Sequence, residues 1–280
     1  MKAFKYLAIA LTFVIGLSAC EKIELTHPYD DTDGRTALFQ VFSHEPVTVA
    51  AANYIDSVYV NDVLYSSVNG SGQLVTYNGV PGGGIGRFFS AKPGDIKLRF
   101  MRGGKDVYER VVNLKQGRQG IYVYDLNENP SVIEMNSFGE RPTPSPADWD
   151  TDSVVYVRFV NLLYEDATTP YPGKLQYQWR RADQDEDTWQ NVGNPVAFGE
   201  ATDFEVITIH KTTFNSNGSQ NVYYRLLTDE GEVLQVLNTN DKMVNYSDYW
   251  TATLGRAYSH HFAGVRTAKP VSSVRQWTVR

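Results

Sequence analysis

The sequence predicts an all-β protein built from antiparallel sheets. The 280-residue chain contains 18 Tyr, 13 Phe and 5 Trp, and aromatic and β-branched side chains favour strands over helices. Residues 96–100 alternate apolar and charged side chains with the two-residue period of a half-buried strand. Turn pairs such as Asn78-Gly79 and Gly103-Gly104 recur at short intervals. Short strands at this spacing are typical of an antiparallel sandwich or barrel.

The first half of the chain shows a regular series of strand patterns separated by turn residues. We expect strands at residues 36–42, 56–61, 73–77, 87–90, 95–101, 107–114, 119–125 and 131–135. No segment beyond the first 20 residues sustains a helical period over three turns. Residues 35–138 are therefore predicted to form one β-sandwich.

A proline cluster then interrupts the pattern. Pro142, Pro144 and Pro146 precede an acidic stretch, which predicts a linker over residues 139–152. The strand pattern restarts directly afterwards, so we expect a second β-sandwich over residues 153–280. Its strands are expected at residues 154–161, 174–181, 204–210, 221–228, 233–237, 249–254, 261–265 and 271–279.

Several of these strands carry recurring strand-turn signatures. They are Val58-Tyr59-Val60-Asn61-Asp62, Val80-Pro81-Gly82-Gly83, Lys92-Pro93-Gly94 before Ile96-Lys97-Leu98, Val112-Asn113-Leu114-Lys115-Gln116-Gly117 before Ile121-Tyr122-Val123-Tyr124, and Val157-Arg158-Phe159-Val160-Asn161. They resemble domain-of-unknown-function family 4397 over residues 35–135 and at the start of the second half, although Phe42-Ser43-His44 replaces the usual Asn-Ala-Ser. The resemblance implies two tandem immunoglobulin-like sandwiches, a secreted or lipid-anchored bacterial protein, and no established catalytic residues.

The first 20 residues have the parts of an export signal in the required order. A short positive region with Lys2 and Lys5 precedes an apolar run at residues 6–17 that is too short to span a bilayer. Leu17-Ser18-Ala19-Cys20 resembles the lipobox of a bacterial lipoprotein. The resemblance implies that residues 1–19 are a signal peptide and that Cys20 is lipidated. Residues 20–34 lack a hydrophobic period and are expected to be a flexible tether.

Charge and cysteine content restrict the partners and the chemistry. A net charge of −6 argues against a nucleic-acid partner, which requires a basic surface. Lipidation of the single cysteine leaves no thiol for disulfides or metal binding. The five histidines lack metal-ligand spacing, and no phosphate-binding loop or nucleophile elbow occurs. We therefore predict no metal, no cofactor and no enzymatic activity.

Two acidic groups carry a weak calcium signal. Asp148, Asp150 and Asp152 have the spacing of a calcium loop, but Ser153 and Phe159 stand where that loop needs Gly and Glu. We interpret them as part of a solvated linker. Adventitious calcium and a charged loop tip both explain the second group, which consists of Asp183, Asp185, Glu186 and Asp187.

Aromatic residues of the second half provide the candidate binding site. Trp179, Trp189, Tyr249 and Trp250 lie in or beside polar segments, and sugar rings bind by stacking their C–H faces on such side chains. The alternative is that these rings fill the core of a sandwich, which suits Trp179 in its alternating strand. Exposure of at least two of them on one surface would favour a carbohydrate ligand.

Two tripeptides resemble a short O-glycosylation motif used by some Gram-negative lipoproteins. They are Asp56-Ser57-Val58 and Asp152-Ser153-Val154. Of the two candidate acceptors, Ser57 and Ser153, the second is favoured because a linker is accessible.

The sequence thus favours a non-enzymatic lipoprotein anchored to the outer membrane, on its surface or periplasmic side, that serves as an accessory or ligand-binding module. The partner is expected to be a carbohydrate or an envelope protein. The alternative is a fimbrial or adhesin subunit in which residues 271–279 complete a neighbour's sheet by strand addition. A hydrolase is a third class and would need a cleft with convergent carboxylates.

The lipobox generates the first prediction. Cys20→Ala should release the protein from membranes or leave the signal unprocessed, because several acyl chains supply about 0.8 kcal/mol for each buried methylene. Membrane fractionation and mass spectrometry of the N-terminal peptide measure both outcomes. Equal membrane retention of a correctly cleaved variant, with no lipid on the wild-type peptide, would contradict the prediction.

Overall fold

The computed structural model describes residues 36–48, 50–67, 88–135, 152–210, 213–215 and 218–279. Their regular structure is almost entirely β, which confirms the predicted all-β sandwich class. Arg35–Arg280 form one compact unit. Cys20, the predicted signal peptide and tether, the expected strand at 73–77, and residues 139–151 of the expected linker lie outside the described residues.

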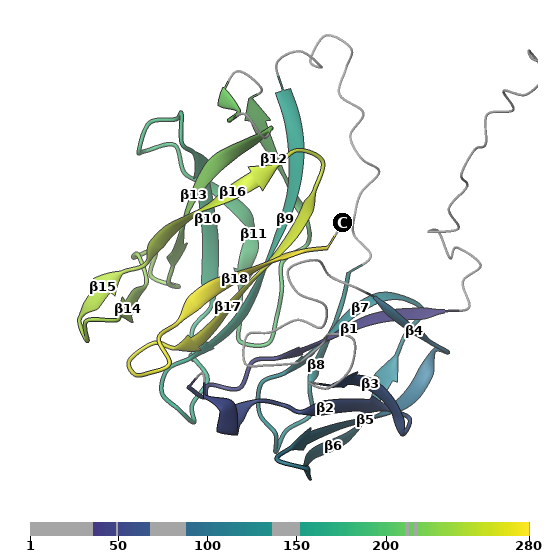
Figure 1. Cartoon of the computed structure of the whole chain (residues 1–280). Coiled ribbons are helices and arrows are strands. Elements are labelled where there is room, and N and C mark those ends of the chain that lie inside the picture. Colours follow the sequence, from purple (N-terminus) through teal and green to yellow (C-terminus); the bar gives the residue numbers. More distant parts are fainter. Residues whose placement is uncertain are drawn as a thin grey trace, which may run out of the picture. The chain divides into compact units, whose positions relative to one another are not determined.

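The first half forms two four-stranded sheets (Figure 1). Their strand orders are β4-β1-β7-β8 and β3-β2-β5-β6. The strands are β1 Ala37–Ser43, β2 Ser57–Val60, β3 Val63–Ser67, β4 Phe89–Ala91, β5 Gly94–Arg102, β6 Lys105–Leu114, β7 Gly117–Val123 and β8 Ser131–Glu134, with a 3-10 helix at Ala51–Asn53.

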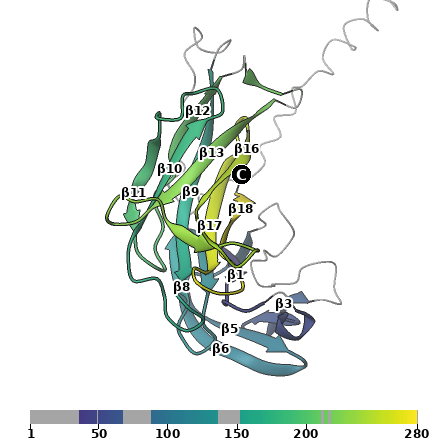
Figure 2. The same ribbon diagram turned by 90° about the vertical axis from the view of Figure 1, so that its left-hand side faces the viewer.

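The second half repeats this topology strand for strand. Its sheets have the orders β12-β9-β17-β18 and β11-β10-β13-β16, and the strands of the second sheet run side by side in Figure 2. The bounds are β9 Asp152–Tyr164, β10 Leu175–Arg181, β11 Gln190–Val196, β12 Glu205–His210, β13 Ser219–Leu227, β16 Ser247–Thr253, β17 Ala257–Val265 and β18 Ser273–Thr278. The hairpin of β14 Gln235–Leu237 and β15 Met243–Asn245 is inserted between β13 and β16.

One pairing in each half departs from the expected antiparallel pattern. The first strand of each half, β1 or β9, pairs in parallel with the penultimate strand, β7 or β17. Parallel neighbours need a long crossover connection. Here the crossover contains all four strands of the opposite sheet and one edge strand of the same sheet, β4 or β12.

Three strands that the sequence patterns did not indicate are β3, β11 and β15. The hairpin between β2 and β3 turns at Asn61 and Asp62, whose φ angles are 51° and 63°. Two consecutive residues with positive φ are the requirement of a tight type I′ hairpin, and Asn and Asp tolerate it. Strand β11 is an edge strand that contains Pro195, which edge positions accommodate.

Each half buries its own apolar core between its two sheets. In β5 the predicted alternation holds, since Ile96, Leu98 and Phe100 are buried while Lys97 and Arg99 are not. The first core includes Phe39, Val41, Val58, Phe100, Tyr108 and Ile121. The second core includes Val157, Phe159, Tyr177, Trp179, Trp250 and Phe262.

A third buried cluster joins the two halves, and we call it the seam. It contains Phe42, Tyr122, Met135, Val160, Leu162, Ala263 and Val279. Successive residues of β1 belong to different clusters, because Val41 faces the first core and Phe42 faces the seam. Every residue of β17 is buried for the same reason. The sheets that contain β1 and β17 are therefore covered on both faces.

The seam also buries a cation. Arg158 of β9 is 1% exposed, and its guanidinium donates to the Glu134 carbonyl at 2.9 Å, the Tyr122 hydroxyl at 2.9 Å and the Ser259 hydroxyl at 3.3 Å. Glu134 and Tyr122 belong to the first half, whereas Ser259 belongs to the second. A buried charge is costly unless its hydrogen bonds are satisfied, so Arg158 ties the two halves in one arrangement.

Two neutral histidines are neighbours on β17, where His261 faces the seam beside this cation and His260 faces the second core against Tyr177 and Trp250. The indole N–H of Trp277 donates to Nδ1 of His261 at 2.9 Å, so Nδ1 is the acceptor and the proton lies on Nε2. This Nε2 lies 2.9 Å from the Ser259 hydroxyl. Burial lowers the pKa of His260 to about 3. Burial, His44 and Arg158 together hold the pKa of His261 well below its usual value.

These histidines predict a pH-dependent stability. An unfolded histidine titrates near pH 6.5, so below that pH the unfolded chain binds protons that the folded chain does not. The free energy of unfolding should be constant above about pH 7. It should then fall toward pH 5 with a limiting slope of about 1.4 kcal/mol per pH unit for each histidine. Urea unfolding between pH 5 and pH 8 measures this slope, and an unchanged free energy across that range would contradict the prediction.

Candidate functional site

Two of the four predicted ligand-binding aromatics belong to the core instead. Trp179 is 4% exposed and Trp250 is 5% exposed, and both pack between the two sheets of the second half. Trp250 makes edge contacts with Tyr258 and His260, at centroid distances of 5.0 Å and 4.8 Å. Neither ring has a face open to a sugar. The expectation that they line a binding surface is therefore wrong.

The other two predicted aromatics lie on the outer face of the β11-β10-β13-β16 sheet. Tyr249 is 56% exposed on β16, and the half-buried Trp189 directly precedes β11. The strand registers pair Arg180 with Tyr223 and Tyr223 with Tyr249. Since Trp179 pairs with Gln190, Trp189 continues this line beside Arg180. We call Trp189, Arg180, Tyr223 and Tyr249 the aromatic row.

Stacked contacts hold the row together. The Arg180 guanidinium lies 5.3 Å from the centroid of the Trp189 ring and 4.7 Å from that of Tyr223. Arg225 covers Trp189 at 4.4 Å, and the rings of Tyr223 and Tyr249 are 6.0 Å apart. Such cation–π contacts contribute about 0.5–1 kcal/mol at exposed sites. These contacts hold the side chains of the row in place without a ligand. Tyr249, at the end of the row, is the most open to solvent.

Hydrogen bonds fix both arginines, one to a backbone carbonyl and the other to a side-chain amide. Arg180 donates to the Gln184 carbonyl at 3.0 Å. Arg225 donates through Nε to Gln178 at 2.9 Å, and Gln178 in turn donates to Asn191 at 2.9 Å. Partial burial lowers the pKa of Arg225. Side-chain amide groups therefore lie beside the aromatic faces on this surface, which suits a ligand that has both hydroxyl groups and apolar C–H faces.

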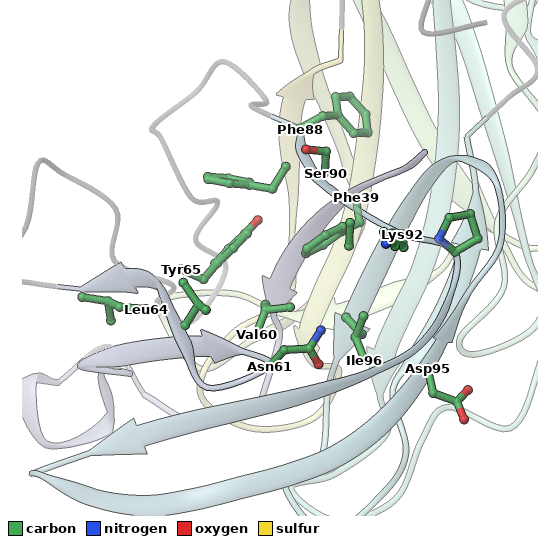
Figure 3. Close-up of a pocket in the computed structure, with 14 residues that line it drawn as sticks. Phe39, Val60, Asn61, Leu64, Tyr65, Phe88, Ser90, Lys92, Asp95 and Ile96 are labelled. Atoms are coloured by element: carbon green, nitrogen blue, oxygen red, sulfur yellow. The ribbon is translucent and has the colours of Figure 1, made fainter. Parts of the chain in front are cut away.

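A second feature is an apolar cavity in the first half (Figure 3). Its volume is about 720 Å³, and its lining includes Phe39, Val60, Leu64, Tyr65, Phe89 and Ile96. Tyr65 stacks on Phe39 at 5.6 Å and contacts Phe89 at 4.0 Å. In Figure 3 the Asp95 carboxylate points away from the cavity. Sequence reasoning missed this cavity because it depends on β3, a strand that no clear pattern indicated.

The two candidate glycosylation serines both lie in strands. Ser57 begins β2, is half-buried and pairs with Ser67 and Met101. Ser153 lies in β9 and pairs with Ile209. Ser153 therefore belongs to a strand and not to the linker, because β9 begins one residue earlier, at Asp152.

The acidic group near residue 183 does not converge on one point. All four residues are exposed, and Asp183 accepts hydrogen bonds from Arg181 at 3.0 Å and Gln220 at 2.7 Å. Within the described ranges, no group of three or more His, Cys, Asp or Glu side chains could hold a metal ion. No helix in the part of the chain that the structure describes is long and apolar enough to cross a membrane.

Comparison with known proteins adds little to this geometry. No family model matches the chain, and no curated protein matches it. Among solved structures, the Bacillus anthracis TIE protein shares 7% identity at a TM-score of 0.23, covering 82% of this chain and 34% of its own. A leucine-rich repeat protein from Bacteroides thetaiotaomicron shares 8% identity at a TM-score of 0.19, covering 82% of this chain and 26% of its own. The chain thus spans only about a third and a quarter of their lengths, and likenesses this distant carry no functional argument.

The division between core and surface aromatics predicts different stability effects. Trp179→Ala should lower the free energy of unfolding by about 3–5 kcal/mol, because it opens a cavity in a packed core. Tyr249→Ala should lower it by less than about 1 kcal/mol, since the ring is mostly in solvent. Urea unfolding of the two variants beside the wild type makes the comparison. Equal losses of stability would show that Tyr249 is packed and not available to a ligand.

Proposed function

We propose that this chain is a non-enzymatic, envelope-anchored lipoprotein whose second sandwich binds carbohydrate. The aromatic row is the observation that carries this proposal. It presents three aromatic rings on one exposed sheet face, with Gln178 and Asn191 beside them. A sugar ring has apolar C–H faces and hydroxyl edges, and this surface offers a partner for each. The lipobox at Cys20 supports the location at the envelope.

The exposed position of the row suits an extended polymer better than a small molecule. Small-molecule sites are concave and bury most of the ligand, whereas the row crosses the outer face of a sheet. A flat surface can contact several consecutive sugar units of a polymer without enclosing either of its ends. We therefore expect the ligand to be a polysaccharide.

The alternative of strand addition has less support. The C-terminal strand β18 pairs with β17 in its own sheet from Ser273 to Thr278. Trp277 on that strand also donates a hydrogen bond to the buried His261. Residues that complete their own sandwich in this way are not available to complete a neighbour's.

A glycoside hydrolase also has less support. Such enzymes use two carboxyl groups, one of them with a raised pKa. Burial raises the pKa of Glu45, but its partner is the Arg102 guanidinium in an ion pair. The ion pair of Glu45 with Arg102 is structural, and it does not supply the second carboxyl group that hydrolysis needs.

Loss of rings from the aromatic row should abolish carbohydrate binding without loss of fold. Trp189→Ala and Tyr249→Ala should remove the retardation of the protein in native gels that contain polysaccharide, because stacking needs an open aromatic face. Gels cast with glucans, mannans, xylans and pectins measure retention, and melting temperatures verify the fold.

Tyr59→Ala is the matched control. Tyr59 lies on β2 in the first half, where the Arg99 guanidinium covers its ring at 4.3 Å, so it reproduces the Arg–Tyr stack outside the row. It should leave retention unchanged. Equal retention of all variants and the wild type on a gel that retards the protein would overturn the assignment of the row.

A further inference from the structure

The apolar cavity of the first half has the form of a small-molecule site. It lies between the edge strands β3 and β4, where the rings of Tyr65 and Phe89 are 4.0 Å apart (Figure 3). Phe39 and Ile96 line it from the core and are only 1% and 2% exposed. Its volume is about 720 Å³. Small-molecule sites are concave, mostly apolar and roughly 300–1,000 Å³ in volume, so this cavity matches them in shape, lining and size.

Two large apolar side chains at this cavity remain in contact with water. Val63 and Leu64 both line it, and they are 70% and 52% exposed. An apolar group that entered the cavity would remove these side chains from water, which is favourable. The cavity therefore favours a ligand with an apolar tail.

Asn61 directs a hydrogen-bond donor toward this space. Its Oδ1 accepts a hydrogen bond from the backbone N–H of Lys97 at 2.8 Å, which fixes the orientation of the amide. Figure 3 shows the amide nitrogen on the opposite side, turned toward the cavity. This nitrogen donates to no acceptor among the described residues. The polar end of a ligand should therefore be an acceptor.

The charged side chains at the cavity favour a negative ligand. The Asp95 carboxylate accepts a hydrogen bond from Asn113 at 2.7 Å and points away from the cavity (Figure 3). Lys92, in the turn between β4 and β5, is exposed and forms no ion pair with the residues that the structure describes. The neighbouring Lys97 and Asp62 neutralise each other at 2.8 Å. The ammonium of Lys92 is thus the available charge.

We infer that this cavity binds a small amphiphile with an apolar tail and a carboxylate head. The tail occupies the space beside Tyr65 and Phe89, and the head accepts hydrogen bonds from Lys92 and Asn61 near the start of β5. Hydrogen bonds between charged groups are stronger than those between neutral ones. The cavity shares no residue with the aromatic row, so this second site is independent of the proposed carbohydrate binding.

The test measures the affinity of the protein for simple amphiphiles by isothermal titration calorimetry. The probes are octanoate, decanoate, decan-1-ol and decylammonium, each below its micelle concentration. The full chain with Cys20→Ala is used throughout, so that no lipid of its own competes. Decanoate should bind about tenfold or more tightly than octanoate, because each buried methylene strengthens binding about fourfold. Decylammonium should bind more weakly than decanoate, because its charge repels Lys92.

Two substitutions test the two ends of the site. Lys92→Met should weaken decanoate binding about fivefold or more and leave decan-1-ol unchanged, because it removes only the charge. Leu64→Trp should weaken binding of every probe about tenfold, because the larger side chain fills part of the cavity. The matched controls are Lys105→Met and Val111→Trp, which change exposed residues of β6 outside the cavity. Both controls should bind as the wild type does.

The outcomes that would overturn the inference are distinct. If no probe binds, or if Leu64→Trp binds as tightly as Val111→Trp, the cavity is not a ligand site. Equal binding of decanoate and decylammonium, or equal effects of Lys92→Met on decanoate and decan-1-ol, would overturn the carboxylate head. Should Leu64→Trp unfold, Val63→Trp replaces it, with the same weakening expected and unchanged affinity overturning the inference. None of these results alters retention in polysaccharide gels, which tests the aromatic row separately.

Discussion

The buried guanidinium of Arg158 is the constraint on which the arrangement of this chain depends. Desolvating a cation costs several kcal/mol unless each N–H finds a partner. Its hydrogen-bond partners come from both halves, with Tyr122 and the Glu134 carbonyl on one side and Ser259 on the other. Movement of one half against the other would break these bonds and leave the charge unsatisfied. The apolar residues of the seam supply buried area, whereas the hydrogen bonds of Arg158 fix the position of one half relative to the other.

The seam also decides which surfaces can serve a ligand. It covers the outer faces of the sheets that contain β1 and β17, as the complete burial of β17 shows. The β11-β10-β13-β16 sheet contributes one face to the second core and leaves the other to solvent. The aromatic row occupies that open face. The inner sheets therefore hold the two halves together, and an outer sheet contains the surface that we propose binds carbohydrate.

The two halves show how one topology accepts different surfaces. Both have the same strand order in both sheets, and the position of a strand within that order does not dictate its outward residues. The outer sheet of the first half presents Tyr59 under Arg99. The equivalent sheet of the second half extends such a stack to Trp189, Tyr223 and Tyr249. The proposed binding surface thus depends on the exposed side chains and not on the fold.

The sequence by itself determined the class of fold and most strand positions, because alternation and turn residues are local properties. The apolar run from Val154 to Leu163, which only Arg158 and Asn161 interrupt, also contained the signal of a strand buried on both faces. Local pattern could not decide which face of each strand meets the core. Trp250 and Tyr249 are neighbours and necessarily point to opposite faces, and only the packing of the second sheet on the first placed one inside and the other in solvent. The period of a strand is encoded by adjacent residues, but its orientation depends on contacts between residues far apart in the chain. The tertiary structure alone therefore decided the aromatic row and the seam.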